Sequence, residues 1–293
     1  MPIATIIAAE TAESGIISDA CDRLNAAGCE PAEIVWLEPA KAADIGFSGD
    51  IAAAKVALLP LQITADVCVQ DTNNRRKMLI ISDMDSTMIT VECIDELADY
   101  AGIKPQIAEI TERAMQGELD FVAALRARVR LLAGLDEAVI ARCLTERVKS
   151  MPGAETLVRT MTAWGAHSVL ISGGFTHFAT PVAAQIGFAE AFANQLDIAG
   201  GALTGEVSGQ VVDAMAKRAQ LEASAVLLGL DRAQILAVGD GANDIPMIEA
   251  AGLGVAYHAK PKAEAAANFA VRHNDLTAIL YAQGVGRSNW VQV

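Results

Sequence analysis

The stretch Met78-Leu79-Ile80-Ile81-Ser82-Asp83-Met84-Asp85-Ser86-Thr87 decides the fold and contains the most informative chemistry of the chain. Its apolar first half is typical of a strand buried on both faces of a parallel sheet. Asp83 and Asp85 follow where this strand runs into a loop, and side chains two residues apart point the same way. A lone pair of this kind is most often a turn or a cap. Neighbouring carboxylates, however, need a cation or a shared proton, which favours a reactive site.

Composition limits the class of protein. The 293 residues are enough for a large domain plus a small one. A net charge of −14 argues against nucleic acid and against an anionic membrane surface as partners. No apolar stretch reaches the roughly 18–20 residues of a membrane span, and the N-terminus lacks the basic start of a secretory signal. The five cysteines are scattered without CxxC spacing, which favours reduced thiols in the cytoplasm.

Two further strands end in polar or glycine-rich sequence, as the first does. The strand candidates 78–82, 167–172 and 235–239 are separated by helical stretches, and they end in DMDST, SGGF and GDGAND. Parallel strands need helical crossovers, so the pattern predicts a doubly wound α/β sheet. Because ligands bind such sheets at the carboxyl ends of the strands, we expect the three polar segments to form one site.

A helical insertion separates the first two of these strands. Residues 90–150 are rich in Ala, Leu, Glu and Arg, and they predict helices over 93–100, 105–115, 121–132 and 137–149. Such a cap would exclude bulk water from a reactive site at the ends of the strands. The glycine-rich stretch 200–209 predicts a β-hairpin beside the sheet.

The N-terminal region has a different pattern. It predicts strands over 4–8, 33–37 and 63–69, helices over 16–26 and 52–59, and a loop near Phe47-Ser48-Gly49. The polar stretch 71–77 is the predicted boundary. We therefore expect a small α+β domain over residues 1–74 and an α/β domain over residues 75–293.

The polar segments have the chemistry of phosphate-ester hydrolysis. Asp83 is placed to attack phosphorus, and Asp85 to protonate the leaving alkoxide and then to deprotonate water. Mg²⁺ is the natural cation for such a site, because it prefers oxygen ligands. Asp240 is the candidate second metal carboxylate, and Asp244 would orient the metal shell from one helical turn further on. Alone, their GDGAND segment would be a turn that caps the next helix.

Phosphate-binding groups complete the predicted site. The hydroxyl of Ser172 and the backbone N–H groups after it form an anion pocket at a strand-to-helix turn. Lys217 is a candidate to neutralise the phosphate and Asp83, although a single helical lysine usually lies on a solvated face. Asn243 offers amide donors.

The motifs DMDST, SGG, Lys217 and GDGAND occur in an order that resembles the haloacid dehalogenase superfamily. Segments 91–98, 110–118 and 125–129 of the cap, together with Phe121 and hairpin residues 203–207, are similar to its phosphoserine phosphatase branch. This resemblance covers about residues 78–282. Bacterial members often carry an ACT-like regulatory domain before the phosphatase domain, and residues 1–74 are compatible with an intact or a degenerate one, used for packing or dimerisation.

The resemblance also implies the role of each site residue. Asp83 would be the nucleophile and Asp85 the general acid/base, with Mg²⁺ bound by the Asp83 carboxylate, the Asp85 carbonyl and Asp240. Ser172, Gly173 and Lys217 would hold the phosphate, with help from Asn243. Glu92 would meet the substrate ammonium and Arg128 its carboxylate. These two cap charges complement phosphoserine independently of the resemblance.

The resemblance predicts a cytoplasmic, Mg²⁺-dependent enzyme that hydrolyses O-phosphoserine in the last step of serine biosynthesis. A homodimer is one assembly that the chain could form. One alternative is another phosphomonoesterase or a phosphotransferase of the superfamily. A second is an amino-acid-binding regulatory protein with a relic phosphatase domain, which the intact acidic motifs disfavour. A dehalogenase is disfavoured because halide departure needs no acid at Asp85.

Overall fold

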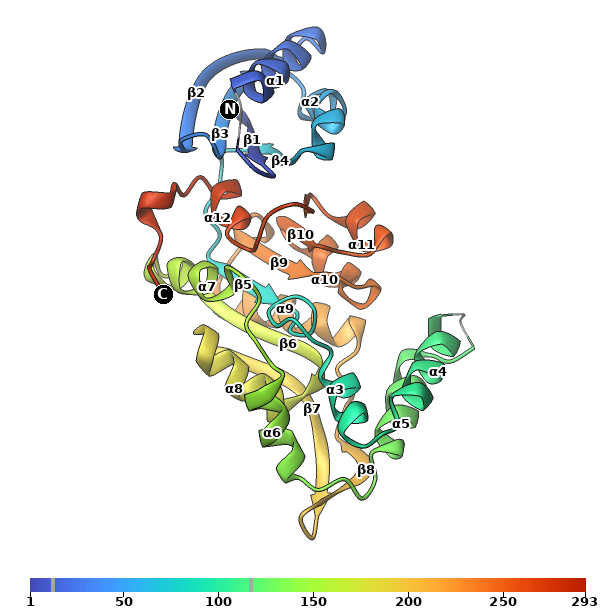
Figure 1. The fold of residues 1–293 in the computed structure, drawn as a ribbon. Helices are drawn as coiled ribbons and strands as arrows, with labels where there is room; N and C mark the ends of the chain where they lie inside the picture. The colour runs from blue at the N-terminus through green and yellow to red at the C-terminus, as the bar shows by residue number, and fades with distance from the viewer. Residues whose placement is uncertain (12–13, 116–117) are drawn as a thin grey trace.

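The computed structural model of the chain describes residues 1–11, 14–115 and 118–293, which form two β-sheets with their helices (Figure 1). The small sheet is made by the N-terminal residues and lies above the large sheet in this view. The predicted cap segment 110–118 is described except for Gln116 and Gly117, which lie outside the described residues.

The large sheet confirms the predicted doubly wound α/β architecture. All its neighbouring strands are parallel except β7 and β8, which pair antiparallel. All four residues of the central strand β5 are buried, as its apolar sequence predicts. The strand order is β11 (Phe269–Val271), β10 (Leu253–Tyr257), β9 (Ile235–Gly239), β5 (Leu79–Ser82), β6 (His167–Phe175), β7 (Glu190–Ala199) and β8 (Ala202–Ser208).

Helices connect and cover these strands. The helix α7 leads into β6, α8 leads from β6 to β7, and α9 leads towards β9. Their bounds are α7 (Ala154–Ala163), α8 (Thr176–Ile186), α9 (Ala214–Leu228), α10 (Ile245–Ala250), α11 (Pro261–Ala266) and α12 (Ala278–Ala282). Short 3₁₀ turns are η1 (Leu59–Ile63), η2 (Arg232–Gln234), η3 (Ala242–Asp244) and η4 (Arg287–Asn289).

The ladder between β6 and β7 is interrupted near its carboxyl end. Ile171 faces Phe192, and the next paired residues are Phe175 and Asn194, so β6 uses two more residues than β7 over this interval. The segment Ser172-Gly173-Gly174 therefore leaves the regular ladder as a bulge. This places the predicted anion pocket in a bulge of β6, beside the end of β5.

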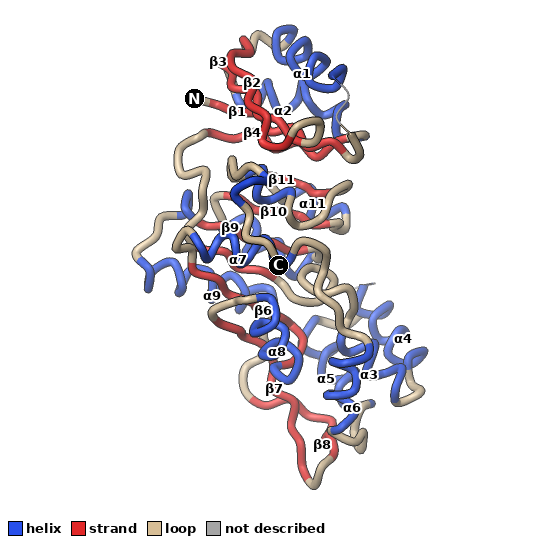
Figure 2. Tube along the Cα trace, turned by 60° about the vertical axis from the view of Figure 1, so that its left-hand side comes forward, coloured by secondary structure: helices blue, strands red, loops and turns tan. Residues whose placement is uncertain are grey.

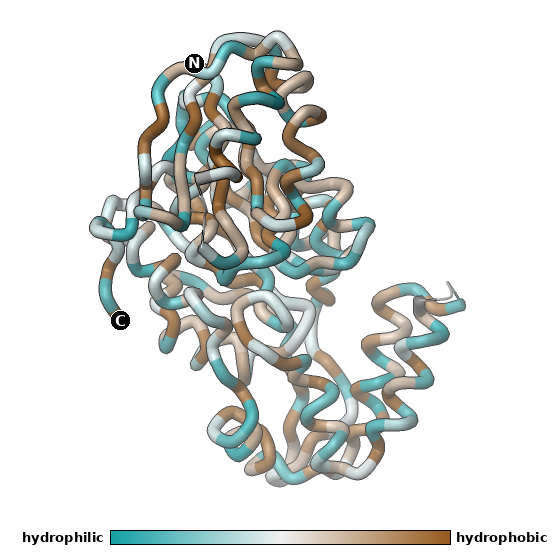
Figure 3. The backbone as a smooth tube through the Cα atoms, turned by 45° about the horizontal axis from the view of Figure 1, so that its top comes forward, coloured by the Kyte–Doolittle hydropathy of each residue, from teal (hydrophilic) through white to brown (hydrophobic). Residues whose placement is uncertain are grey.

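The predicted cap lies between β5 and β6. Its helices are α3 (Cys93–Tyr100), α4 (Lys104–Met115), α5 (Phe121–Leu131) and α6 (Ala138–Glu146), within a few residues of the predicted ranges. The carboxylate of Asp120 accepts a hydrogen bond from the N–H of Ala123 at 2.7 Å and so starts α5 as an N-cap. Apolar and polar residues alternate along these helices (Figure 3), as expected where one side packs on other elements.

The predicted hairpin supports this cap. Its turn is formed by Gly200 and Gly201, both in the left-handed region with φ of 60° and 82°. The N–H of Gly134 donates to the carbonyl of Leu203 at 2.8 Å, and the N–H of Leu203 donates to the carbonyl of Leu135 at 2.9 Å. The end of α5 is thus joined to β8 by backbone hydrogen bonds, which fixes the cap against the large sheet.

The N-terminal sheet has the β-α-β-β-α-β element order of the ferredoxin-like motif. Its strand order is β2-β3-β1-β4, with each neighbouring pair antiparallel. The predicted loop at Phe47 and Ser48 was wrong, because both residues belong to an inner strand. The elements are β1 (Pro2–Ala8), α1 (Ser14–Ala26), β2 (Glu30–Glu38), β3 (Ala42–Ser48), α2 (Ile51–Leu58) and β4 (Ala65–Asp71).

The small sheet lies next to the β10–β11 end of the large sheet (Figure 2), and polar contacts join the two. Arg75, within the predicted boundary stretch, binds both carboxylate oxygens of Asp44 at 2.7 Å and donates to the carbonyl of Ala282 at 2.9 Å. Asp66 of β4 accepts the backbone N–H groups of Arg272 at 2.7 Å and Asn274 at 3.1 Å. The division into domains 1–74 and 75–293 stays a prediction, because this junction is itself buried and hydrogen-bonded.

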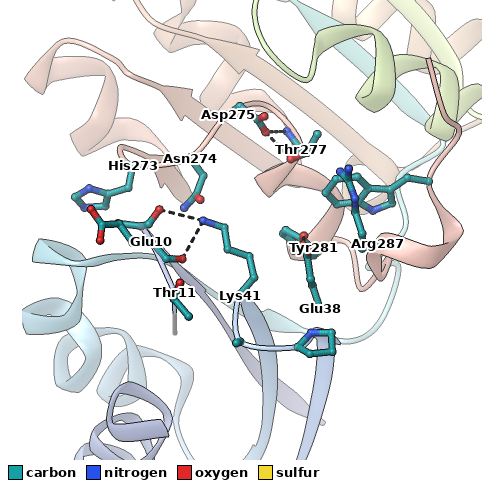
Figure 4. A pocket seen from close by; sticks show the side chains of 14 residues that line it. Glu10, Thr11, Glu38, Lys41, His273, Asn274, Asp275, Thr277, Tyr281 and Arg287 are labelled. Atoms are coloured by element: carbon teal, nitrogen blue, oxygen red, sulfur yellow. Dashed lines mark hydrogen bonds between the residues drawn. The ribbon is translucent and has the colours of Figure 1, made fainter. Parts of the chain in front are cut away.

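A polar pocket of about 680 Å³ lies at this junction (Figure 4). In it, Lys41 donates to the backbone carbonyls of Ala8 at 2.7 Å and Ala9 at 3.0 Å, so its charge is already hydrogen-bonded. None of the residues that we predicted for the site is among those that line it. Within the described ranges, no helix has the length and apolar character needed to cross a bilayer.

Candidate active site

Asp83 lies directly after β5, with its side chain buried. Its Oδ1 atom accepts a hydrogen bond from the N–H of Met84 at 2.7 Å and forms an ion pair with Lys217 Nζ at 2.7 Å. Burial raises the pKa of Asp83, the negative charge of Asp244 raises it further, and Lys217 opposes both effects. Among the described residues, the hydrogen bond and the ion pair of Asp83 both involve Oδ1, which leaves Oδ2 to a substrate or a cation.

Lys217 is fully buried between two carboxylates. Besides Asp83 it binds Asp244 Oδ1 at 2.7 Å. Burial opposes the charged ammonium, but the two carboxylates outweigh it and raise the pKa of Lys217. The helix α9 is capped by Asp213, whose Oδ1 accepts from the N–H of Ala216 at 2.8 Å, and this places Lys217 in the first turn. The lysine is therefore not a surface residue.

Asp85 lies beside the bulge of β6. A Cβ atom on Gly174 would lie 2.8 Å from Asp85 Oδ2 and 3.0 Å from Ser172 Oγ, so the glycine lets both side chains approach the backbone of β6 closely. Asp85 Oδ1 accepts from the N–H of Cys93 at 3.3 Å. Burial, with help from the charge of Glu92, raises the pKa of Asp85 to about 7. A carboxyl that titrates near neutral pH can both give and take a proton.

Asp240 follows β9, the strand next to β5. Its Oδ1 atom accepts from the hydroxyl of Thr87 at 2.8 Å, and burial raises its pKa to about 6. Both carboxylate oxygens of Asp244 already have partners, because Oδ1 binds Lys217 and Oδ2 accepts the N–H groups of Asp240 at 3.2 Å and Gly241 at 3.0 Å. Asp244 thus holds Lys217 and the loop in place.

The residues present fit a hard divalent cation. One carboxylate oxygen from each of Asp83, Asp240 and Asp244 lies within 4.8 Å of the others. The carboxylates of these three residues, of Asp85 and of Glu92 outnumber the nearby cations Lys217 and Arg128, which leaves the site short of positive charge. Within the described backbone, the carbonyl of Asp85 accepts no hydrogen bond. All of these donors are oxygens, the atoms that Mg²⁺ prefers.

The bulge of β6 offers donors on the other side of the site. Ser172 is buried, and its Oγ accepts from the N–H of Gly174 at 2.8 Å. A Cβ atom on Gly173 would lie 3.0 Å from Cζ of Phe121, the first residue of α5. The cap therefore contacts the bulge directly. The side chain of Asn243 lies against Gly241 of the neighbouring loop, with Oδ1 2.4 Å from where a Cβ on that glycine would stand.

Glu92 and Arg128 come from two different elements of the cap. Glu92 directly precedes α3, and its Oε1 accepts from the hydroxyl of Ser86 at 2.6 Å. Burial lowers the pKa of Arg128, while Asp95, Glu92 and Asp85 oppose this change. Within the described residues, Arg128 makes one hydrogen bond, from Nε to the carbonyl of Ala124 at 3.4 Å. Its terminal amino groups are free to bind an anion.

The structure thus brings the acidic motifs, Lys217 and the bulge together at the carboxyl ends of β5, β6 and β9. A sheet with this topology, an inserted cap and an aspartate after the first strand defines a class of hydrolase. The chain belongs to the haloacid dehalogenase-like hydrolase family, because the sequence model of that family matches residues 77–252.

Several similar proteins within this family are phosphoserine phosphatases. The chain is 43% identical over 235 residues to the phosphoserine phosphatase of Streptomyces coelicolor, covering 80% of this chain and 57% of the relative. It is similar to the crystal structure of a probable phosphoserine phosphatase from Vibrio cholerae, with a TM-score of 0.79, 34% identity, and coverage of 98% of this chain and 88% of that one.

A second solved structure, a phospho-aspartyl intermediate analogue of phosphoserine phosphatase, has a TM-score of 0.66 and 38% identity. It covers 70% of this chain and 98% of that one. The chain spans less than two thirds of the length of several curated relatives, with 57%, 65% and 64% for three of them.

Two polar residues of the site were missed by the sequence analysis. Thr87 belongs to the DMDST motif itself, and its hydroxyl donates to Asp240 after the neighbouring strand β9; its membership of the motif was the available signal. Asn194 lies at the end of the interrupted ladder and contacts the bulge. Its position in β7 carried no signal, because the hairpin was expected to begin only near residue 200.

Proposed function

We propose that the chain is a phosphoserine phosphatase, which hydrolyses O-phosphoserine to serine and phosphate as the last step of L-serine biosynthesis. The observation that carries this proposal is the different environment of the two carboxylates after β5. Asp83 is ion-paired with Lys217, as a nucleophile requires, whereas Asp85 has a pKa of about 7, as an acid/base requires. The curated relatives support phosphoserine as the substrate.

In the first step, a carboxylate oxygen of Asp83 attacks phosphorus and the bond from phosphorus to the seryl oxygen breaks. The proton of Asp85 passes to that oxygen, so serine leaves as an alcohol. The N–H of Gly173, the hydroxyl of Ser172 and Lys217 stabilise the charge on the phosphoryl oxygens. The product on the protein is an aspartyl phosphate.

In the second step, water attacks the same phosphorus and gives a proton to Asp85. The bond from phosphorus to Asp83 breaks, and phosphate leaves. The cap, through Phe121 over the bulge, keeps bulk water from the site during the first step. Mg²⁺ held by Asp83, Asp240 and the Asp85 carbonyl would supply positive charge beside the phosphoryl oxygens.

Chelation is expected to remove phosphate release and Mg²⁺ to restore it. The reason is the surplus of carboxylates over cations around Asp83. Phosphate release from O-phosphoserine is measured with EDTA, with EDTA followed by excess Mg²⁺, and with EDTA followed by excess K⁺ as the control for ionic strength. Full activity in excess EDTA would contradict the proposed metal site.

Arg128→Ala is expected to lower kcat/KM for O-phosphoserine much more than for an ester without a carboxylate. Loss of a charge-assisted pair with the substrate carboxylate costs about 1.5–3 kcal/mol, so kcat/KM falls by about 10- to 100-fold. Hydrolysis of p-nitrophenyl phosphate, which has no carboxylate, is expected to change by less than about threefold. Steady-state kinetics on both esters gives the comparison.

Arg126→Ala is the matched control for this substitution. Arg126 lies on the same helix α5, but its side chain is exposed. Arg126→Ala is expected to leave kcat/KM for both esters unchanged. Glu92→Gln is expected to lower kcat/KM for O-phosphoserine selectively, as Arg128→Ala does. Equal losses on both esters for Arg128→Ala would show that the cap charge does not select the substrate.

The location and the assembly of the protein belong to the same proposal. The five cysteines are all free, which supports the predicted cytoplasmic location. Ile34, Val35 and Trp36 of the edge strand β2 are exposed apolar side chains, which support the predicted homodimer. Amino-acid binding by the N-terminal sheet stays a prediction.

A further inference from the structure

Asn194 of β7 is a buried polar residue that the reaction steps above do not use. Its side chain is 2% exposed. Nδ2 donates to the carbonyl of Gly173 at 2.8 Å, and Oδ1 accepts from the N–H of Val212 at 2.8 Å. Because one partner is an acceptor and the other a donor, these two bonds fix the orientation of the carboxamide.

The interrupted ladder explains why a side chain is needed at this position. Between the pairs Ile171–Phe192 and Phe175–Asn194, the backbone of β6 leaves β7. The carbonyl of the half-buried Gly173 then has no partner in the paired register of β7, and a carbonyl that is shielded from water and lacks a hydrogen bond costs free energy. The carboxamide of Asn194 replaces the missing ladder bond, and so it determines how the Gly173–Gly174 peptide unit is turned.

The other half of the carboxamide holds the segment that enters α9. Val212 is followed by the N-cap Asp213, and Lys217 lies in the first turn of that helix. The two segments are also in direct contact, since a Cβ atom on Gly173 would lie 3.6 Å from the carbonyl oxygen of Val212. One side chain thus joins the bulge to the start of the lysine helix.

We propose that Asn194 is a positioning residue that sets the separation between the phosphate donors of the bulge and the ammonium of Lys217. It touches neither the substrate nor the reacting atoms. The bulge of β6 and the start of α9, which Asn194 joins, provide the donors and the ammonium that bind the same phosphoryl group. The inference rests on the proposed phosphatase function for its reaction, but its effect falls on phosphate binding, which can be measured with inorganic phosphate alone.

Asn194→Ala is expected to lower the affinity for inorganic phosphate, measured as a competitive inhibitor. It is expected to lower kcat as well. Misplacing binding groups by about 1 Å can cost about 100-fold in rate, so we expect losses of about 10- to 100-fold. The affinity for inorganic phosphate and kcat/KM for p-nitrophenyl phosphate and O-phosphoserine are measured on the full chain, together with the thermal midpoint.

Gln283→Ala is the matched control. Gln283 is 1% exposed and also joins two backbone groups, with Oε1 accepting from the N–H of Lys77 at 3.0 Å and Nε2 donating to the carbonyl of Ile279 at 3.3 Å. It is expected to lower the thermal midpoint as Asn194→Ala does, but to leave phosphate affinity and kcat unchanged. A structural role alone would make the two variants alike.

Asn194→Asp keeps the shape and the acceptor for the Val212 N–H, but it removes the donor to Gly173. It is expected to lower the affinity for inorganic phosphate at least as much as Asn194→Ala does. It also provides the test if the alanine variant does not fold. Unchanged phosphate affinity in a folded Asn194→Asp or Asn194→Ala protein would overturn the inference. Absence of phosphoserine hydrolysis by the wild type would instead overturn the proposed function, and the phosphate measurements would still decide the role of Asn194.

Discussion

Asp83→Asn is expected to remove phosphate release from every phosphate ester, by a factor of at least about 10⁴. An amide nitrogen or oxygen at this position does not form the acyl phosphate that the proposed reaction needs. The loss should be the same for O-phosphoserine and for p-nitrophenyl phosphate, because the nucleophile acts on phosphorus and not on the serine moiety. Phosphate release under single-turnover conditions measures it.

The substitution should leave the fold intact. Lys217 keeps its bond to Asp244 at 2.7 Å, and the amide oxygen can still accept from the N–H of Met84. Burial and Asp244 raise the pKa of Asp83, which means that its charged form is disfavoured in the folded protein. Removing that charge is therefore expected to keep or to increase the free energy of unfolding at neutral pH.

Asp99→Asn is the control, because Asp99 lies in an exposed ion pair with Arg147 on the cap. It should retain full activity. Rapid acid quenching during turnover, followed by peptide mapping, should find phosphate on Asp83 in the wild type and on no residue of Asp83→Asn. A phosphorylated peptide from another part of the chain, or a rate within about tenfold of wild type, would refute the assignment.

The location of the site could be predicted from the sequence because topology determines it. Strands that alternate with helices form a parallel sheet, and the segments after its strands meet at one edge. The order β9-β5-β6 places GDGAND, DMDST and SGG on three adjacent strands. Only the local pattern around Asp83 and the helical crossovers were needed for that prediction.

The missed strand β3 shows what such patterns leave out. Ala42, Ala43 and Asp44 have no β-branched or aromatic side chain, so the segment has weak strand propensity. Asp44 is nevertheless buried in an inner strand, because Arg75 binds both of its oxygens from 31 residues further along the chain. Local sequence contains no record of a partner that distant.

The environment of Lys217 depends on distant partners for the same reason. A lysine in the first turn of an exposed helix usually lies in water, and no local feature distinguishes this one. It is buried because α9 packs where Asp83 and Asp244 converge, 134 residues before it and 27 residues after it. The same holds for Asn194, whose partners lie 21 and 18 residues away.

Lys217→Met is expected to destabilise the folded protein more than any other single change in the site. It leaves Asp83 and Asp244 buried next to each other without a counter-ion, and breaking a buried ion pair in this way costs about 3–5 kcal/mol. Urea unfolding in EDTA measures the free energy of unfolding without compensation by a metal ion. Phosphate release is expected to fall as well, because the phosphoryl group loses its cation.

The double variant Lys217→Met/Asp244→Asn separates the two effects. Removing the second charge should recover much of the lost free energy of unfolding, because replacing both partners of a buried pair is often nearly neutral. Phosphate release should not recover. Arg147→Met is the control, since Arg147 also pairs with two carboxylates, Glu96 and Asp99, but on the exposed cap surface. It should unfold almost as the wild type does. If Lys217→Met matched this control, or if the double variant regained activity, the buried triad would not have the role that its geometry indicates.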